Sequence, residues 1–275
     1  MQIQKHKAKK SLGQNFLKSN LALKKIVEAG EISPDDTILE IGPGKGALTE
    51  KLLEKSDHVI AIEKDNALFN FLNEKFEKEI KEKKLILLNE DILKFSITNY
   101  ELRIKDYKII ANIPYNITGA ILKKFLANKN QPERMILMVQ NEVAKRIMGK
   151  DGESILSISV KAYGNPKIIM KVPARYFSPA PKVDSAVIAI KNISKKNFTL
   201  LETPSSFGHS PLAGGEKFEE KFWEIVRAGF AHKRKKLSSN LKNYLGNACV
   251  LELGNKRAEE LSLEDWLELV KNAEN

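Results

Sequence analysis

Four consecutive residues, Asn112-Ile113-Pro114-Tyr115, carry groups that suit the chemistry of a planar amine. The exocyclic amine of adenine is a poor nucleophile because its lone pair is delocalised into the ring. The side-chain carbonyl of Asn112 and the backbone carbonyl of Ile113 could accept both N–H bonds and aim the lone pair at a methyl donor. Such catalysis works by orientation and by stabilising developing charge, without a strong base. Pro114 would stiffen the turn, and Tyr115 would offer a ring on which the base stacks.

A base held on one face by Tyr115 needs a second aromatic ring on its other face. Phe177 lies in the segment 176–185 (YFSPAPKVDS), which its Pro-x-Pro sequence makes stiff. We therefore expect Phe177 to complete a stacking clamp. Both assignments have structural alternatives, since Asn and Pro are common in strand-exit turns and Phe177 could belong to the core.

A glycine-rich turn, Gly42-Pro43-Gly44-Lys45-Gly46, follows the apolar run 37–41 and precedes a helical pattern. Glycines between a strand and a helix let a ligand approach the backbone closely. The Gly-x-Gly-x-Gly spacing, preceded by Glu40, is typical of S-adenosylmethionine-dependent methyltransferases, whereas an NAD enzyme needs Gly-x-Gly-x-x-Gly. We expect Glu40, Gly42 and Gly44 at the cofactor, although Glu40 could instead be a structural hydrogen-bonding residue.

Two carboxylates follow the next two expected strands. Glu63 stands about 21 residues after Gly42, where an acidic residue can accept the ribose hydroxyls of an adenosine-containing cofactor. Asp91 follows the apolar run 85–88, and its carboxylate or the adjacent backbone could meet the adenine amine of the cofactor. Both residues are therefore expected in the cofactor site.

The scaffold for these residues is an alternation of apolar runs and helical patterns that continues to about residue 191. The expected strands are 37–41, 58–62, 85–88, 108–111, 135–139, 167–172 and 185–190. Leu68, Phe69, Leu72 and Phe76 form a helical stripe between two of them. This alternation predicts an α/β fold, with a parallel sheet covered by helices on both faces and ending in a hairpin.

The pattern changes after residue 191. Residues 194–215 contain prolines, serines and glycines in a composition typical of loops. Three helices follow, marked by Phe218, Phe222, Ile225 and Val226, by Leu237 and Leu241, and by Trp266, Leu267 and Val270. We expect a first domain at 1–193 with a basic N-terminal arm, a linker at 194–216, and a helical domain at 217–275 that binds RNA.

The balance of charge predicts a polyanionic partner. The chain of 275 residues has 46 Lys and Arg against 35 Asp and Glu, a net charge of +11. Lys and Arg gain affinity for nucleic acid by releasing phosphate counterions, although a Lys-rich solvated surface would have the same composition. Beside a site for a splayed base, we favour RNA phosphate contacts. The expected RNA-binding residues are Lys7, Lys9 and Lys10 in the arm, Arg146, and the run His232, Lys233, Arg234, Lys235 and Lys236, which should open a helix.

Other kinds of site have little support in the composition. Cys249 is the single cysteine, and the four histidines lack ligand spacing, so we expect no disulfide and no metal. No apolar run approaches the ~18 residues of a membrane span, and no apolar leader follows the basic N-terminus. We therefore expect a cytoplasmic, monomeric protein with no membrane partner.

Four motifs occur in the order 11–17 (SLGQNFL), 40–44 (EIGPG), 112–116 (NIPYN) and 177–185 (FSPAPKVDS). Together they resemble the small-subunit ribosomal RNA adenine dimethyltransferase family, the KsgA-type enzymes, over nearly the whole chain. The resemblance implies a Rossmann-like S-adenosylmethionine-dependent methyltransferase domain followed by a small all-helical C-terminal domain. It also implies that Gln14, Asn15 and Leu17 contact the cofactor beside Gly42, Glu63, Asp91 and Asn112.

The same resemblance implies a substrate and a partner. The family dimethylates N6 of two adjacent adenosines in a hairpin loop near the 3′ end of small-subunit rRNA, and it serves as a late checkpoint of subunit assembly. The expected partner is therefore the small ribosomal subunit with its rRNA. Three alternatives stay open: an erythromycin-resistance type of large-subunit rRNA methyltransferase, a DNA adenine methyltransferase, and an assembly factor without catalysis.

Overall fold

The computed structural model describes residues 8–9, 12–96, 106–199, 211–242, 244 and 253–273, without the side chains of 211–214. The chain forms two compact units. The first comprises Met1–Ala144 and Asn165–Ile193, and the second comprises Lys145–Gly164 and Ser194–Asn275. Residues 145–164, which the sequence-based bounds place in the first domain, thus group with the C-terminal helices.

A seven-stranded sheet is the core of the first unit, in the order β4-β3-β2-β5-β6-β9-β7. Its strands are β2 (Thr37–Ile41), β3 (His58–Ile62), β4 (Leu85–Leu88), β5 (Tyr107–Asn112), β6 (Arg134–Gln140), β7 (Asn165–Val172) and β9 (Ser185–Lys191). All seven expected strands are confirmed, with small differences at their ends. The pairing of β9 is antiparallel to both β6 and β7, so the sheet is mixed and closes with the expected hairpin.

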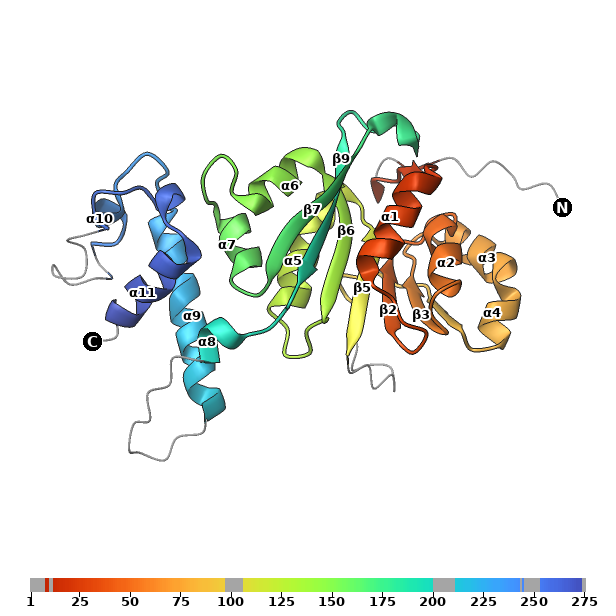
Figure 1. The fold of residues 1–275 in the computed structure, drawn as a ribbon, viewed down its shortest axis with the longest axis horizontal. Helices are drawn as coiled ribbons and strands as arrows, with labels where there is room; N and C mark the ends of the chain where they lie inside the picture. The colour runs from red at the N-terminus through yellow and green to blue at the C-terminus, as the bar shows by residue number, and fades with distance from the viewer. Residues whose placement is uncertain are drawn as a thin grey trace. The chain divides into compact units, whose positions relative to one another are not determined.

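Helices cover both faces of this sheet, as expected for nearly continuously apolar strands. The helices of the unit are α1 (Asn20–Gly30), α2 (Ala47–Leu53), α3 (Asn66–Lys75), α4 (Glu77–Lys81), α5 (Thr118–Leu126) and the first half of α6 (Asn141–Met148). Figure 1 shows α1 in front of the sheet and α5 behind it. The expected stripe on α3 buries Leu68 and Leu72, and Phe76 is buried just beyond its end.

The strand order creates a reversal between β2 and β5. The chain runs outward from β2 through β3 to β4, and then returns to β5 on the other side of β2. Helices that leave these two central strands go to different faces, and the carboxyl ends of the strands are left open between them. Open α/β sheets bind their ligands at this position.

The second unit is helical. Its elements are α7 (Ile155–Lys161), α8 (Lys196–Thr199), α9 (Pro211–Gly229), α10 (Leu237–Asn240), η5 (Ala258–Glu260) and α11 (Leu263–Ala273). Aromatic rings join its segments, since Tyr163 stacks on Trp223 at 6.1 Å and Phe198 meets Phe222 edge-on at 5.4 Å. The three helices expected near the C-terminus are confirmed.

Two local expectations for this unit were wrong. Residues 194–215 were expected in a loop, but α8 occupies Lys196–Thr199 and α9 begins at Pro211. Proline suits the first turn of a helix, and the backbone at Gly215 passes close to α8, since a Cβ there would lie 3.4 Å from the Phe198 carbonyl oxygen and 3.5 Å from the Thr199 methyl group. Packing against α8 therefore compensates for the low helix propensity of glycine.

The second correction concerns the basic run 232–236, which does not open a helix. It forms an exposed turn after α9, and α10 starts only at Leu237. Asn240 closes this turn, because its side-chain nitrogen donates to the carbonyls of Gly229 at 2.6 Å and His232 at 3.2 Å. Those bonds hold the backbone of the run away from helical pairing.

Neither a membrane span nor a metal cluster is found in the described part of the chain. Within that part, no helix is long and apolar enough to cross a membrane. The same residues contain no group of three or more His, Cys, Asp and Glu placed to hold a metal ion. The expectations about metal, location and a monomeric state stay predictions.

Candidate active site and cofactor pocket

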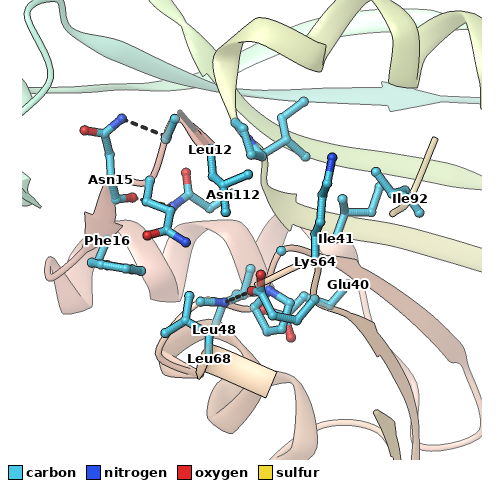
Figure 2. Close-up of a pocket in the computed structure, with 18 of the residues that line it drawn as sticks. Leu12, Asn15, Phe16, Glu40, Ile41, Leu48, Lys64, Leu68, Ile92 and Asn112 are labelled. Carbon is cyan, nitrogen blue, oxygen red and sulfur yellow. Dashed lines mark hydrogen bonds between the residues drawn. The ribbon is translucent and has the colours of Figure 1, made fainter. Parts of the chain in front are cut away.

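A pocket opens at the carboxyl ends of the central strands, where the strand order reverses (Figure 2). Its volume of about 430 Å³ lies in the range of small-molecule sites. All nine residues expected at the cofactor line it: Gln14, Asn15, Leu17, Glu40, Gly42, Gly44, Glu63, Asp91 and Asn112. Motifs that are far apart in the sequence therefore meet in one cavity.

The glycine-rich turn after β2 forms one wall of the pocket. Gly42, Gly44 and Gly46 have φ values of 66°, 62° and 76°, which side chains disfavour. A Cβ on Gly44 would lie 3.1 Å from the Phe16 ring. The turn thus depends on glycine for both its conformation and its space, and it presents bare backbone to the cavity.

Glu63, directly after β3, provides a buried acceptor beside that backbone. Its Oε2 accepts the N–H of Gly44 at 3.0 Å, and its Oε1 accepts the N–H of Asp65 at 2.9 Å. Burial raises the pKa of Glu63, and the backbone hydrogen bonds oppose that rise. A carboxylate held in this way can still accept from two vicinal hydroxyls, so the residues present fit the ribose of S-adenosylmethionine.

Glu40 lies deeper, with only 1% of its surface exposed. Its Oε2 accepts from the Thr49 hydroxyl of α2 at 2.7 Å. Burial raises the pKa of Glu40 to about 8, the Thr49 bond opposes the rise, and the charge of Glu63 adds to it. Burial therefore favours the protonated form of Glu40. The residue lines the pocket and also makes the structural hydrogen bond that the sequence offered as the alternative role.

The Asp91 carboxylate is already engaged. Its Oδ2 pairs with Lys64 Nζ at 2.8 Å, and its Oδ1 accepts the N–H of Leu93 at 3.0 Å. The bond to Lys64 lowers the pKa of Asp91, so the carboxylate stays charged. An adenine amine would have to share this carboxylate with Lys64 or use the adjacent backbone.

The N-terminal segment closes a further side of the pocket. Gln14 Nε2 donates to Asp65 Oδ2 at 2.9 Å, and Lys9 Nζ pairs with Asp65 Oδ1 at 3.0 Å. Asp65 also caps α3 and donates its N–H to Glu63. Lys9, which was expected to contact RNA, is thus tied beside the ribose carboxylate, with half of its side chain exposed.

The residues 112–115 follow β5 and lead into η3 (Tyr115–Ile117). All four, Asn112, Ile113, Pro114 and Tyr115, line the pocket. Asn112 Nδ2 donates to the backbone carbonyl of Asn15 at 3.2 Å, and Figure 2 shows both residues on the same side of the cavity. Because this bond uses the amide nitrogen, the amide oxygen of Asn112 is the group left to accept an N–H.

Phe177 differs from its expected position as a stacking ring. It is 3% exposed, belongs to the apolar cluster of the first unit and does not line the pocket, although Ser178 does. The cause is a two-stranded pairing in which β8 (Phe177–Ser178) lies antiparallel to β1 (Phe16–Leu17), with Phe177 opposite Leu17. In this structure the Phe177 ring is therefore a core side chain, which was the alternative considered for it. A stacking role for Phe177 stays a prediction, and it would require the ring to move into the pocket.

The remaining expected RNA-binding residues are exposed where the structure describes them. Arg146 is exposed on α6, and all five residues from His232 to Lys236 are exposed in their turn. Lys7 and Lys10 lie outside the described residues. None of the expected RNA-binding residues that are described lines the pocket, so their role would be contact away from the reacting base.

Some lining residues were missed by sequence reasoning. Phe16, Lys64 and Ile92 line the pocket beside predicted residues. Lys64 follows Glu63 and Ile92 follows Asp91 in the sequence. Their positions next to predicted site residues after a strand could therefore have identified both as lining residues. Phe16 lies within the motif 11–17, but only the tertiary structure shows its ring against Gly44.

The strand order, with one antiparallel strand near the sheet edge and a glycine turn facing an acidic residue, defines a Rossmann-like S-adenosylmethionine-dependent methyltransferase. Comparison with known proteins then narrows the class. The family model described as "Ribosomal RNA adenine dimethylase" matches residues 5–202, and the chain belongs to that family.

Curated relatives agree with this assignment. A ribosomal RNA small subunit methyltransferase A of Dehalococcoides mccartyi (strain CBDB1) is 41% identical, covering 96% of this chain and 87% of the relative. The protein of the same name from Fusobacterium nucleatum subsp. nucleatum is 35% identical, covering 96% of this chain and 97% of the relative. The similarity therefore extends through both units.

Two solved structures show the same fold. A dimethyladenosine transferase from Plasmodium falciparum is 26% identical, with a TM-score of 0.72 over 92% of this chain and 95% of that chain. The 23S rRNA methyltransferase ErmE is 25% identical, with a TM-score of 0.71 over 95% of this chain and all of that chain. The fold is thus shared with a dimethyladenosine transferase and with a 23S rRNA methyltransferase.

Proposed function

We propose that this protein dimethylates N6 of two adjacent adenosines in the 3′-terminal hairpin loop of small-subunit rRNA, with S-adenosylmethionine as the methyl donor. One observation carries the proposal: Asn112, the residue suited to hold an adenine amine, lines the same pocket as the Glu63 carboxylate and the glycine-rich turn. Family membership and the names of the curated relatives support the choice of the small subunit.

Within the pocket, Glu63 would accept the ribose hydroxyls of the cofactor, and the bare backbone of Gly42 and Gly44 would let its methionine tail lie close. Gln14, Asn15 and Leu17 close the site from the N-terminal side, and Asp91 would hold the adenine of the cofactor. Bound S-adenosylmethionine supplies an electrophilic methyl group. The remaining chemistry belongs to the residues after β5.

The amide oxygen of Asn112 and the backbone carbonyl of Ile113 accept the two N–H bonds of the target adenine. Both carbonyls then draw the amine toward tetrahedral geometry and direct its lone pair at the methyl group. Tyr115 supports the base by stacking, and Pro114 fixes the loop. The new N–C bond would replace the S–C bond of the sulfonium, which leaves as a neutral thioether, and the cationic amine would lose its proton to water. Orientation and charge stabilisation therefore suffice.

The RNA is held by phosphate contacts away from the base. Arg146 is an exposed cation, and so are the four Lys and Arg residues at 233–236. His232 adds an exposed hydrogen-bonding group beside them. We infer that they, together with Lys7, Lys9 and Lys10 of the arm, contact phosphates and set the register of the hairpin. A loop adenosine leaves its stack at a lower cost than one in a duplex. The same binding would let a monomer take part in assembly of the subunit.

The test is methyl transfer to defined ribosomal particles. Purified protein with radiolabelled S-adenosylmethionine is incubated with under-methylated small subunits, fully methylated small subunits and large subunits, and the labelled nucleoside is identified. We expect N6-methylated adenosine in the under-methylated small subunits alone. Labelling of the large-subunit RNA would assign the protein to the resistance type, and tight subunit binding without labelling would favour the assembly factor.

A further inference from the structure

Ser185 lies at the catalytic edge of the sheet because β9 is antiparallel. The carboxyl ends of β5 and β6 are adjacent, with Asn112 opposite Met138. The first residue of β9, Ser185, pairs with Gln140, the last residue of β6. An antiparallel strand thus begins where its parallel neighbours end, and its first side chain is close to the loop that follows β5.

At this edge the Ser185 hydroxyl contacts the hydroxyl of Tyr115. Ser185 Oγ and Tyr115 Oη are 2.5 Å apart, a short hydrogen bond between two hydroxyls. Ser185 is fully buried, and Tyr115 is half-buried. Burial raises the pKa of the Tyr115 phenol, so its proton stays in place for this bond at neutral pH.

The backbone that carries Ser185 is held in place by Asp184. Asp184 Oδ1 accepts the N–H of Ala174 at 3.0 Å, and its Oδ2 pairs with Lys171 at 2.8 Å. Its backbone carbonyl also accepts the N–H of Asn141 at the start of α6, at 3.0 Å. These bonds join three segments around the start of β9, so the Ser185 hydroxyl is a fixed point.

Tyr115 is therefore held at both ends. Its backbone begins η3, where its carbonyl accepts from the Thr118 hydroxyl at 3.1 Å. Its hydroxyl is held by Ser185 on a different part of the sheet. A ring anchored at both ends has the position and direction of its axis set before any base arrives, which lowers the cost of ordering it on binding.

We propose that Ser185 is a positioning residue for methyl transfer, which holds in place the Tyr115 ring on which the target adenine stacks. The proposal rests on the function proposed above. It assigns a role to Ser185, the last residue of the motif 177–185. Ser185 does not line the pocket, so it acts through Tyr115 and not on the substrate.

The test is a double-mutant cycle with Ser185→Ala, Tyr115→Phe and the double variant, measured on full-length protein. We expect each single variant to lower kcat by about 3- to 10-fold, the size of one neutral hydrogen bond. The double variant should be no slower than the slower single variant, because both substitutions remove the same bond. Affinity for S-adenosylmethionine, measured by calorimetry, should change less than about twofold in all three, since the bond lies outside the cofactor contacts.

Two matched controls separate positioning from general destabilisation. Ser56→Ala removes another buried serine hydroxyl, which donates to the Asp36 carbonyl at 2.6 Å before β3 begins. Tyr107→Phe removes a tyrosine hydroxyl that donates to the Asn130 carbonyl at 3.1 Å, at the start of β5. Both should lower the melting temperature and leave kcat of the folded protein unchanged.

Wild-type kcat in Ser185→Ala would overturn the proposal, and so would a double variant whose loss is the product of the two single losses. A kcat lost to the same extent in Ser56→Ala would also overturn it, by showing that destabilisation alone is enough. The cycle uses whichever rRNA the wild-type protein methylates. A wrong substrate assignment would therefore be seen in the rRNA that the wild-type protein methylates. A wrong role for Ser185 would be seen only in the kcat values of the variants.

Discussion

Gly44 donates its backbone N–H to the Glu63 carboxylate over 3.0 Å, which links the turn after β2 to the residue after β3. The parallel pairing of these strands aligns their ends, with Ile41 opposite Ile62. The glycine turn and the acidic residue are thus one unit of structure, and the conformation of the turn keeps the carboxylate in place before any cofactor binds.

Replacing Glu63 should therefore weaken cofactor binding. Glu63→Gln substitutes a side-chain amide for an acceptor that takes two backbone N–H groups, and it weakens the bonds to the ribose hydroxyls. We expect the Kd for S-adenosylmethionine to rise roughly 10- to 100-fold, as for the loss of one charge-assisted hydrogen bond. Calorimetry measures it, with the exposed Glu54→Gln as the control. Unchanged affinity would remove Glu63 from the site.

Asn112→Ala should abolish methyl transfer by removing the acceptor for the adenine amine. We expect a loss of at least about 100-fold in kcat, comparable to the loss of one preorganised electrostatic contact. Cofactor affinity should weaken but stay measurable, because the bond to the Asn15 carbonyl is lost as well. Single-turnover transfer to rRNA measures the first effect, and Asn128→Ala in an exposed loop serves as control. Undiminished transfer would refute the orienting role.

Glu40 should make the stability of the fold depend on pH. Its pKa is raised from 4.5 to about 8 in the folded protein. Between these values the folded state keeps a proton that the unfolded state has lost, so the free energy of unfolding falls as pH rises from 4.5 to 8 and levels off above. The loss should reach the order of a few kcal/mol.

Glu40→Gln removes this dependence while keeping an acceptor for Thr49. We expect its stability advantage over the wild type to be small at pH 5 and to grow toward pH 8. Urea unfolding at both pH values measures the difference. The control is Glu28→Gln on α1, an exposed site whose pKa is lowered by Lys25. A stability gap that stays constant with pH would contradict a protonated Glu40.

Two identical substitutions should have opposite effects on stability. In Gly46→Ala, the new methyl group would lie 2.6 Å from the Phe76 ring at a φ of 76°. Backbone strain and crowding should lower the free energy of unfolding by about 2–4 kcal/mol. In Gly119→Ala on α5 the methyl group meets nothing within 4 Å, and helix propensity should add about 0.5–1 kcal/mol. Thermal unfolding compares the pair, and equal shifts would show that the fit around Gly46 is not tight.

The expected strands, the glycine turn and Asn112 could be predicted from the sequence because each depends on local information. Apolar runs of strand length, glycines at a strand exit, and an acidic residue after the next strand are properties of short segments. Their convergence also follows from the sequence, since parallel strands place their carboxyl ends at one edge. The nine cofactor candidates therefore meet in one pocket.

What the sequence left undecided depends on pairings between distant segments. Phe177 is buried because β8 pairs with β1, about 160 residues earlier, and no local pattern at 177 records that pairing. The ion pair between Asp91 and Lys64 also joins residues that are distant in the sequence. Residues 145–164 likewise group with the helical unit through contacts with residues after 194.

The four residues 112–115 show both sides of this division. Their sequence determined that an amide carbonyl, a backbone carbonyl and an aromatic ring follow one another at a strand exit. Only the tertiary structure placed Ser185 of an antiparallel strand against the Tyr115 hydroxyl and Asn15 against the Asn112 amide. Chemical groups are a property of sequence, whereas their orientation is set by contacts that form only when the sheet is assembled.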